Sequence, residues 1–336
     1  MGSLVRRSVV TGLLVLLLGI GGIAYLRHWA ATPLPLQEPI VVELAQGGTF
    51  AGFASELKAA GVIRDDWLLT AYARWKGHAN RIQAGEYRII VGETPEGLLA
   101  DLVAGTVVTY EARIVEGTTI MRVVEQLAET PKLVNDLGSV TAATLMSRLQ
   151  LGDGHAEGQF FPDTYSYKKG TRISDILLRA YERMHNVIER EWPNRAKGLP
   201  YATPQDALIM ASIIEKETGR DEDRGKISRV FVSRLQKAMR LQTDPSVIYG
   251  LGDSFDGNLT RAQLDADNPY NTYRTTGLPP TPIALPGLAS IRAALHPDEG
   301  DYLYFVARGD GTSEFSSTLD QHLAAVRRYQ LEGGLL

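Results

Sequence analysis

The first strong pattern in the chain is an uninterrupted apolar run near the N-terminus. Residues 9–26 carry no charged side chain. As a helix they would rise about 27 Å, close to the hydrocarbon thickness of a bilayer. Arg6 and Arg7 precede the run, so the positive-inside rule predicts that residues 1–8 are cytoplasmic. We expect an uncleaved transmembrane helix at 9–27. A cleaved signal peptide is the competing interpretation.

Shorter periodic segments follow this run and predict a small domain. The alternating Pro and Leu residues of 33–36 indicate a short stiff linker at 28–39 that lifts the next domain off the membrane. A small α+β module is then expected at 40–110. Its predicted strands and helices, in chain order, are 40–44, 50–60, 66–76, 85–89 and 94–104.

The rest of the chain, 111–336, has the pattern of a larger mixed α/β domain. The strand, Gly-Thr turn and helix of 113–127 repeat the arrangement of 41–57. This repeat indicates two related modules, although a common strand-to-helix turn gives the same pattern. We therefore predict an α+β protein with two soluble domains behind its N-terminal helix. Other expected elements are helices at 173–191, 203–217, 227–239 and 322–329, a strand at 302–307, and aromatic-rich loops at 156–165 and 268–287.

Composition narrows the chemistry without assigning it. The net charge of −4 argues against a protein that binds nucleic acid through broad phosphate attraction. There is no cysteine, which excludes disulfides and thiolate metal sites. The six histidines are scattered and form no HExxH pair. The nucleophile elbow GxSxG and the nucleotide-binding loops GxxxxGK[ST] and GxGxxG are also absent. After these classes are set aside, chemistry carried out by carboxyl groups is what remains.

The helix expected at 203–217 carries the most informative carboxylates. Thr203 is suited to cap it, and the residues from 207 to 214 are almost wholly apolar, which predicts a buried helix. Glu215 falls inside the apolar arc at 100° per residue, whereas Glu217 falls at its edge. Burial would raise the pKa of a carboxyl group and make it a proton donor. The alternative is a helix end with solvated charges, followed by a surface turn at 220–224.

Glycoside cleavage fits such a carboxylate. It needs a protonated carboxylic acid near the leaving oxygen, and hydrolases normally add a second carboxylate at a defined separation. Glu215 is the candidate acid. Its candidate partners are Glu217, Asp244 and Glu157, and the sequence alone fixes no separation among them. For Asp244, turn formation by Asp-Pro is an adequate alternative explanation.

Several motifs follow one another in a recognisable order along the chain. They are Glu157-Gly158, Phe161-Pro162-Asp163-Thr164-Tyr165, Ala211-Ser212-Ile213-Ile214-Glu215-Lys216-Glu217-Thr218, the segment from Met239 to Gly250, Asn268-Pro269-Tyr270-Asn271-Thr272-Tyr273 and Gly277-Leu278-Pro279-Pro280. Together they resemble one family, the endolytic murein transglycosylases, also called MltG or YceG-like proteins. The resemblance runs from the apolar helix to the C-terminal helix. It implies a bacterial inner-membrane protein with a LysM-like periplasmic module at 40–110 and a catalytic domain at 111–336.

The resemblance implies that Glu215 is the catalytic acid/base of a lytic transglycosylase. In that reaction one Glu protonates the oxygen between MurNAc and GlcNAc and then accepts the proton of the MurNAc C6 hydroxyl. The product is a 1,6-anhydroMurNAc end, formed without water, cofactor or metal. A second carboxylate is therefore not required. The candidate substrate-binding residues are Glu157, Glu217, Gln242, Thr243, Asp244, Tyr249, Asn271 and Tyr273.

The family pattern is not matched everywhere. Ser313 stands where the family often has His, Thr281 where Gly is usual and Leu285 where Asn is common. These departures put a role for a histidine at 313 in doubt and leave the Glu215 segment intact.

The expected partners are peptidoglycan strands and membrane-embedded cell-wall synthases, with most of the chain in the periplasm and no nucleic-acid partner. Two alternatives stay open: a non-enzymatic, membrane-anchored glycan-binding scaffold, and a muramidase that uses water.

Overall fold

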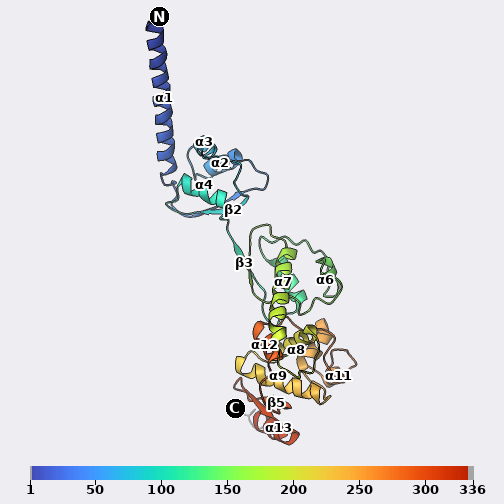
Figure 1. The fold of residues 1–336 in the computed structure, drawn as a ribbon. Coiled ribbons are helices and arrows are strands. Elements are labelled where there is room, and N and C mark those ends of the chain that lie inside the picture. The colour runs from blue at the N-terminus through green and yellow to red at the C-terminus, as the bar shows by residue number, and fades with distance from the viewer. Residues whose placement is uncertain (1, 332–336) are drawn as a thin grey trace. The chain divides into compact units, whose positions relative to one another are not determined.

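The computed structural model describes residues 2–331 and combines helices with short strands (Figure 1). It divides into two compact units. The first consists of Met1–Tyr110 and Ser166–Gly170, and the second of Glu111–Tyr165 and Thr171–Leu336. No pattern in the sequence had indicated that a short piece of the later chain, 166–170, belongs to the first unit.

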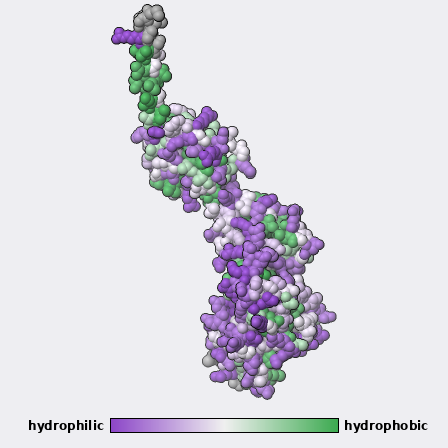
Figure 2. Space-filling model, in the orientation of Figure 1, coloured by the Kyte–Doolittle hydropathy of each residue, from purple (hydrophilic) through white to green (hydrophobic). Residues whose placement is uncertain are grey.

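The predicted N-terminal helix is present and extends beyond its expected ends. α1 spans Gly2–Ala30, and its segment Val9–Ala30 is long and apolar enough to cross a membrane. In Figure 2 the visible surface of that segment is largely apolar. Its large apolar side chains from Val9 to Ile23 are exposed, whereas Ala30 at its end is buried. Solvent-facing apolar side chains on this scale are unfavourable in water, so a bilayer is the environment that α1 fits.

The segment after α1, which the sequence predicted as a spacer at 28–39, packs against the first unit. Ala30 is 0% exposed and Leu34 is 6% exposed, and both belong to the hydrophobic core of the first unit. The backbone N–H of Leu34 also donates to the carbonyl of Glu93 at 2.7 Å. Apolar burial and this hydrogen bond hold the segment against the unit, so it packs with the core; that it lifts the unit off a membrane stays a prediction.

The small α+β module agrees with its predicted elements. An antiparallel pair of strands places Ile40 opposite Ile89 and Leu44 opposite Gly85. The helices between and after the strands cover this pair with a core that includes Leu57, Leu69, Tyr72, Tyr87 and Leu102. The elements are β1 (Ile40–Leu44), α2 (Phe50–Ala59), α3 (Asp66–Trp75), β2 (Gly85–Ile89) and α4 (Pro95–Ala104).

The later chain is mostly helical with two further strand pairs, β3 with β4 and β5 with β6. Its elements are β3 (Tyr110–Arg113), α5 (Ile120–Glu129), α6 (Leu145–Arg148), β4 (Thr164–Tyr167), α7 (Ile173–Glu191), the 3₁₀ helix η1 (Trp192–Asn194), α8 (Pro204–Glu217), α9 (Asp221–Gln236), α10 (Asp244–Leu251), the 3₁₀ helix η2 (Gly252–Ser254), α11 (Arg261–Asp265), α12 (Leu288–Leu295), β5 (Tyr304–Ala307), β6 (Ser313–Ser316), α13 (Leu319–Val326) and the π-helix η3 (Arg327–Leu331).

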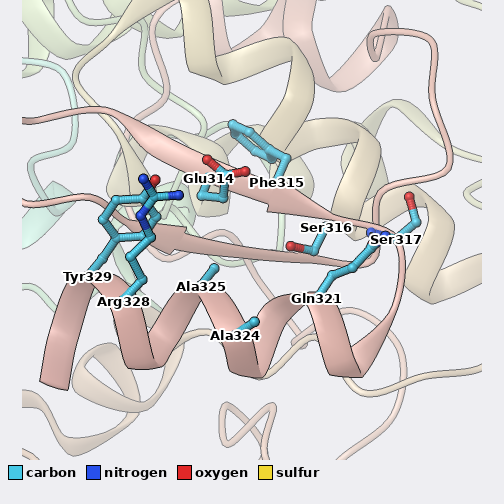
Figure 3. A pocket seen from close by; sticks show the side chains of 9 residues that line it. All are labelled: Glu314, Phe315, Ser316, Ser317, Gln321, Ala324, Ala325, Arg328 and Tyr329. Carbon is cyan, nitrogen blue, oxygen red and sulfur yellow. Dashed lines mark hydrogen bonds between the residues drawn. The ribbon is translucent and has the colours of Figure 1, made fainter. Parts of the chain in front are cut away.

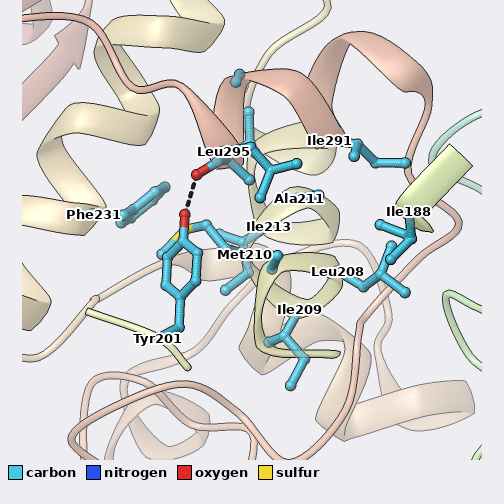
Figure 4. Close-up of a cluster of buried hydrophobic side chains, with 14 of the residues drawn as sticks. Ile188, Tyr201, Leu208, Ile209, Met210, Ala211, Ile213, Phe231, Ile291 and Leu295 are labelled. Atoms are coloured by element: carbon cyan, nitrogen blue, oxygen red, sulfur yellow. Dashed lines mark hydrogen bonds between the residues drawn. The ribbon is translucent and has the colours of Figure 1, made fainter. Parts of the chain in front are cut away.

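α8 lies at the centre of the second unit. Every residue from Ala207 to Ile214 is buried, and the helix packs against α9 and α12. Figure 4 shows this cluster, with Tyr201 donating a hydrogen bond to the carbonyl of Ala294 on α12. A helix that is apolar nearly all round must be surrounded, and the neighbouring elements meet that requirement.

Two segments that the sequence analysis considered as turns, by way of alternative explanation, are helix starts instead. Asp221 begins α9, so the charged stretch 220–224 is largely its first turn rather than a surface turn. Acidic residues at 221, 222 and 223 favour this position because they complement the helix dipole. Asp244 and Pro245 open α10, since proline is well tolerated in the first helical turn.

The burial of Leu34 generates a test. We expect Leu34→Ala to lower the free energy of unfolding of the first unit by about 3 kcal/mol, because the substitution leaves a cavity in a packed core. A denaturant titration of the detergent-solubilised chain, followed by tryptophan fluorescence, measures this. The exposed Gln37→Ala is the control and should change it by less than about 0.5 kcal/mol. Equal effects of the two substitutions would restore the spacer interpretation.

Candidate active site

The end of α8 presents two carboxylates in different surroundings. The helix starts with a capping box in which Thr203 Oγ1 accepts from the N–H of Asp206, and the Asp206 carboxylate accepts from the N–H of Thr203. This cap fixes where the helix begins. Glu215 and Glu217, two residues apart, differ by about 200° around the helix, so their side chains leave it in nearly opposite directions.

The Glu215 side chain is held by a backbone donor and a cation. The N–H of Gly287 donates to Glu215 Oε2 at 3.0 Å, and Arg224 Nη2 lies 3.9 Å from Oε1. Only 7% of the side chain is exposed. The Glu215 side chain also lies close to the turn at Gly117. A β-carbon added at Gly117 would lie 3.7 Å from Glu215 Cγ. Two loops and α9 thus fix the orientation of this carboxylate.

A further carboxyl group, Glu116, reaches the same point. A β-carbon at Gly287 would collide with Glu116 Oε1, so the absence of a side chain at 287 makes room for Glu116. Burial raises the pKa of Glu116, and the negative charge of Glu215 raises it further. Glu116 also lines a pocket of about 620 Å³ formed by residues 111 and 113–116 together with 162–164. No local pattern had singled out Glu116.

Arg224 was also missed by sequence reasoning. Its side chain is 9% exposed, and its Nε donates to Ser290 Oγ at 3.2 Å. A second nitrogen forms an ion pair with Asp221 one turn earlier on α9. Burying a guanidinium costs free energy unless it is paired. The buried position of Arg224 beside Glu215 therefore depends on these partners. The charged run 220–224 was the available signal, but it was interpreted as a solvated turn.

Glu217 faces a different set of partners. Thr243 Oγ1 donates a hydrogen bond to Glu217 Oε1, and Thr243 is itself fully buried. Burial raises the pKa of Glu217, the Thr243 hydrogen bond and the Arg234 charge oppose that rise, and the Asp244 charge adds to it. Glu217 is therefore biased toward the protonated form that a general acid needs.

A pocket of about 550 Å³ brings four of the predicted residues together. Two of them are joined directly, since Tyr273 Oη donates to Asp244 Oδ1 at 2.6 Å. Glu215 does not line this pocket. The lining residues are Glu217, Arg234, Leu241, Gln242, Asp244, Tyr273, Phe305, Val306, Ala307, His322, Val326 and Gln330.

Arg234 lines this pocket and forms hydrogen bonds to several groups around it. It is buried, and its guanidinium donates to the carbonyl of Leu241 at 2.8 Å, to Gln242 Oε1 at 3.2 Å and to the carbonyl of Leu303 at 2.7 Å. Gln242 has a φ of +56°, a left-handed conformation that non-glycine residues seldom adopt. Such conformations persist only where surrounding contacts impose them, and Arg234 supplies one. Sequence reasoning had treated Arg234 only as part of a core helix.

Two other predicted residues support the pocket from behind. Asn271 is fully buried; its amide donates to the carbonyls of Leu264 at 3.0 Å and Ala266 at 2.7 Å, and its oxygen accepts from the N–H of Tyr273 at 3.0 Å. These hydrogen bonds use the side-chain amide of Asn271, which is the group that would contact substrate. Asn271 thus bonds to the backbone of Tyr273, and buried Thr243 bonds to Glu217; their contacts with substrate stay predictions.

Glu157 and Tyr249 form a separate buried pair. Glu157 is 1% exposed; it accepts from the N–H of Ile120 at 3.0 Å and from Tyr249 Oη at 3.2 Å. Burial raises the pKa of Glu157 to about 7, although these hydrogen bonds oppose the rise. Neither residue lines the pocket around Glu217. Glu157 instead ties α10 to the start of α5, directly after the turn that touches Glu215.

A third pocket, of about 530 Å³, lies between β6 and α13 (Figure 3). Its lining contains none of the predicted site residues. Within residues 2–331, no group of three or more histidines or carboxylates comes together in a way that could hold a metal ion.

Comparisons with known proteins point to one family. The profile of the YceG-like family matches residues 42–328. A Bacillus subtilis protein named endolytic murein transglycosylase is 33% identical over 306 residues, which cover 86% of this chain and 84% of that protein. A Streptococcus pneumoniae protein of the same name is 28% identical, and the match spans 91% of this chain but 62% of that longer protein.

One solved structure extends the likeness to the fold. It is titled a putative YceG-like protein from Listeria monocytogenes and is 30% identical to this chain. The match has a TM-score of 0.54 and covers 86% of this chain and 99% of that one.

The raised pKa of Glu157 predicts a pH-dependent stability. The folded chain keeps this proton up to about pH 7, whereas the unfolded chain releases it near 4.5. Glu157 therefore contributes stability that is fully present below the unfolded pKa and is lost as pH rises toward the folded pKa, by about 3 kcal/mol in total. Glu157→Gln should remove that loss between pH 5 and 7 in denaturant titrations. The exposed Glu182→Gln should keep the wild-type slope; a wild-type slope in Glu157→Gln would contradict the assignment.

Proposed function

Because the chain belongs to the YceG-like family, we propose that it is an endolytic murein transglycosylase that cuts nascent peptidoglycan strands within their length. The name is that of its relatives, and the B. subtilis relative is covered over most of its length. The observation that carries the proposal is the Glu215 carboxylate at the end of buried α8, held by Gly287 and Arg224.

The proposed reaction is an intramolecular transfer at the MurNAc anomeric carbon. Protonated Glu215 gives its proton to the glycosidic oxygen, the bond from that oxygen to MurNAc C1 breaks, and GlcNAc leaves with a hydroxyl group. The MurNAc C6 oxygen then bonds to C1, and its proton returns to Glu215. Atoms and charge balance without water, so the site needs one carboxyl group that works as acid and then as base. Neighbouring dipoles must stabilise the oxocarbenium-like charge.

Different observations favour each of the two carboxylates of α8 for the acid/base role. Glu215 is favoured by its fixed orientation and by the cluster of groups around it. Glu217 is favoured by its raised pKa and its place in a polar pocket with Gln242, Asp244 and Tyr273. We assign the acid/base role to Glu215 and give the pocket around Glu217 the task of holding sugar hydroxyl and acetamido groups.

We also propose that residues 40–110 form a LysM-like, glycan-binding module. The order β1, α2, α3, β2 with an antiparallel strand pair supports this. A pocket of about 480 Å³ lies between the loop before α2 and the loop after α3. Its lining offers amide, hydroxyl and cationic groups beside an aromatic ring, which suits a sugar. The lining residues are Gly48, Thr49, Phe50, Ala51, Thr70, Arg74, Ala79, Asn80 and Ile82.

The proposed location follows from α1. An uncleaved α1 with Arg6 and Arg7 on the cytoplasmic side would leave both units in the periplasm, attached to the inner membrane. Nascent glycan strands are made at that surface, so membrane-embedded synthases are the expected protein partners.

The acid/base assignment predicts a clear difference between two conservative substitutions. Glu215→Gln should lower the cleavage rate by about 10²- to 10⁴-fold, because the amide can neither donate nor accept the required proton. Glu217→Gln keeps an acceptor for Thr243 and should cost less than about tenfold. The assay digests uncrosslinked glycan with the purified chain and identifies new ends by mass spectrometry.

The same assay separates the alternatives. Anhydro ends that disappear in Glu215→Gln support the proposal, and reducing ends would identify a hydrolytic muramidase. No cleavage by the wild-type chain would favour a glycan-binding scaffold. Full activity in Glu215→Gln together with an inactive Glu217→Gln would transfer the role to Glu217.

Filling the pocket of about 480 Å³ tests the proposal that residues 40–110 bind glycan there. Ala51→Trp places a large side chain on an exposed position in the pocket lining, and we expect at least a tenfold loss of glycan association. Ala60→Trp, exposed in the same unit and outside the pocket lining, is the matched control and should bind like the wild type. Pull-down with insoluble peptidoglycan measures both. Equal binding by the two variants would refute this pocket as the glycan site.

A further inference from the structure

The end of α1 contacts the side of the first unit through a cation and an aromatic ring. The guanidinium carbon of Arg27 lies 5.3 Å from the ring centroid of Trp75, the last residue of α3. This distance is within the range of a cation–π interaction. The contact joins a residue of the proposed membrane-spanning helix to a side chain 48 positions later in the folded module.

The membrane fixes the depth of this contact. The segment Val9–Ala30 would rise about 33 Å, slightly more than the hydrocarbon thickness. Arg27 therefore falls at the outer boundary, and its charge belongs among the headgroups because burying it in hydrocarbon is costly. Trp75, which packs on that guanidinium, must lie at the same level.

The side chains around Trp75 suit a headgroup layer. Trp75 is 42% exposed although it is large and apolar. Lys76 Nζ lies 5.6 Å from its ring centroid and also pairs with Glu96 at 2.9 Å. Tryptophan concentrates at membrane interfaces because its ring is apolar and its N–H is polar, and lysine and arginine beside it can meet phosphate.

The first unit has little freedom to move away from this level. α1 packs against both α3 and α4. Ala30 and Leu34 lie in the core of the unit, so no flexible segment separates helix from module. The position of α1 in the bilayer consequently sets the position of α3.

We propose that the surface formed by Arg27, Trp75 and Lys76 lies in the outer headgroup layer of the membrane that α1 crosses and contacts phospholipid phosphate. This inference rests on the membrane insertion of α1 proposed above. It makes the first unit a membrane-surface module and not one suspended in the periplasm. The cationic side chains contribute through phosphate, and Trp75 contributes through the interface itself.

The test uses the full chain in phosphatidylethanolamine–phosphatidylglycerol vesicles, with spin labels on the lipid headgroup or at carbon 12 of the acyl chain. Three single-tryptophan chains, made by Trp→Phe changes at the other positions, retain Trp75, Trp29 or Trp192. The Trp192 chain gives the baseline for quenching unrelated to the first unit. We expect the headgroup label to quench Trp75 at least twofold above that baseline and more strongly than the deep label.

Other results of the quenching experiment would reject the proposal. Trp75 at baseline while Trp29 is quenched would overturn the inference and leave the anchor intact. Both at baseline would overturn the anchor as well. Stronger quenching of Trp75 by the deep label would place it in hydrocarbon and reject the headgroup position. In the unmodified chain, a photoactivatable headgroup lipid should crosslink within residues 72–80. Crosslinks confined to α1 would contradict the proposal.

Discussion

A carboxylate at the end of a buried helix must be given partners, and the second unit is arranged around that requirement. α8 is buried at every position from Ala207 to Ile214, so the groups that follow it cannot all be left to solvent. Desolvating a charge costs several kcal/mol unless hydrogen bonds or a counter-charge offset the cost. The loop ending at Gly287 and the side chain of Arg224 meet that need for Glu215, and Thr243 meets it for Glu217. The helix, its flanking loops and α9 are therefore mutually dependent.

The two carboxylates differ because their partners differ in kind. Glu215 receives a backbone N–H and lies near a guanidinium, and these partners fix the orientation of its carboxyl group. Glu217 receives a hydroxyl group from Thr243. Its burial and the nearby Asp244 charge raise its pKa, against the opposing effect of that hydrogen bond. Helical geometry separates the two environments, since residues two apart point in nearly opposite directions. One helix end thus provides two chemically distinct positions without a sharp bend in the chain.

Local signals predicted much of the fold and less of the site. The cap at Thr203 and the apolar run after it were sufficient to predict α8, because both act within a few residues. Glu116 and Arg224 were not found, since their proximity to Glu215 depends on chain segments that only the tertiary fold brings together. The segment containing Leu34 was taken as a spacer because Pro and Leu alternate there. Whether such leucines are buried depends on the surface they meet, which periodicity does not reveal.

The direct passage of α1 into the core of the first unit has a mechanical consequence. With α1 in the bilayer as proposed above, the helix and the module would tilt together. A helix longer than the hydrocarbon layer tilts to keep its apolar surface covered, so a change in bilayer thickness would change the angle of the module. Because Arg74 lines the module's pocket and precedes Trp75, that angle also sets how the pocket opening faces the membrane plane. Lipid composition would then act on glycan capture through geometry, with no ligand and no change in the fold of the module.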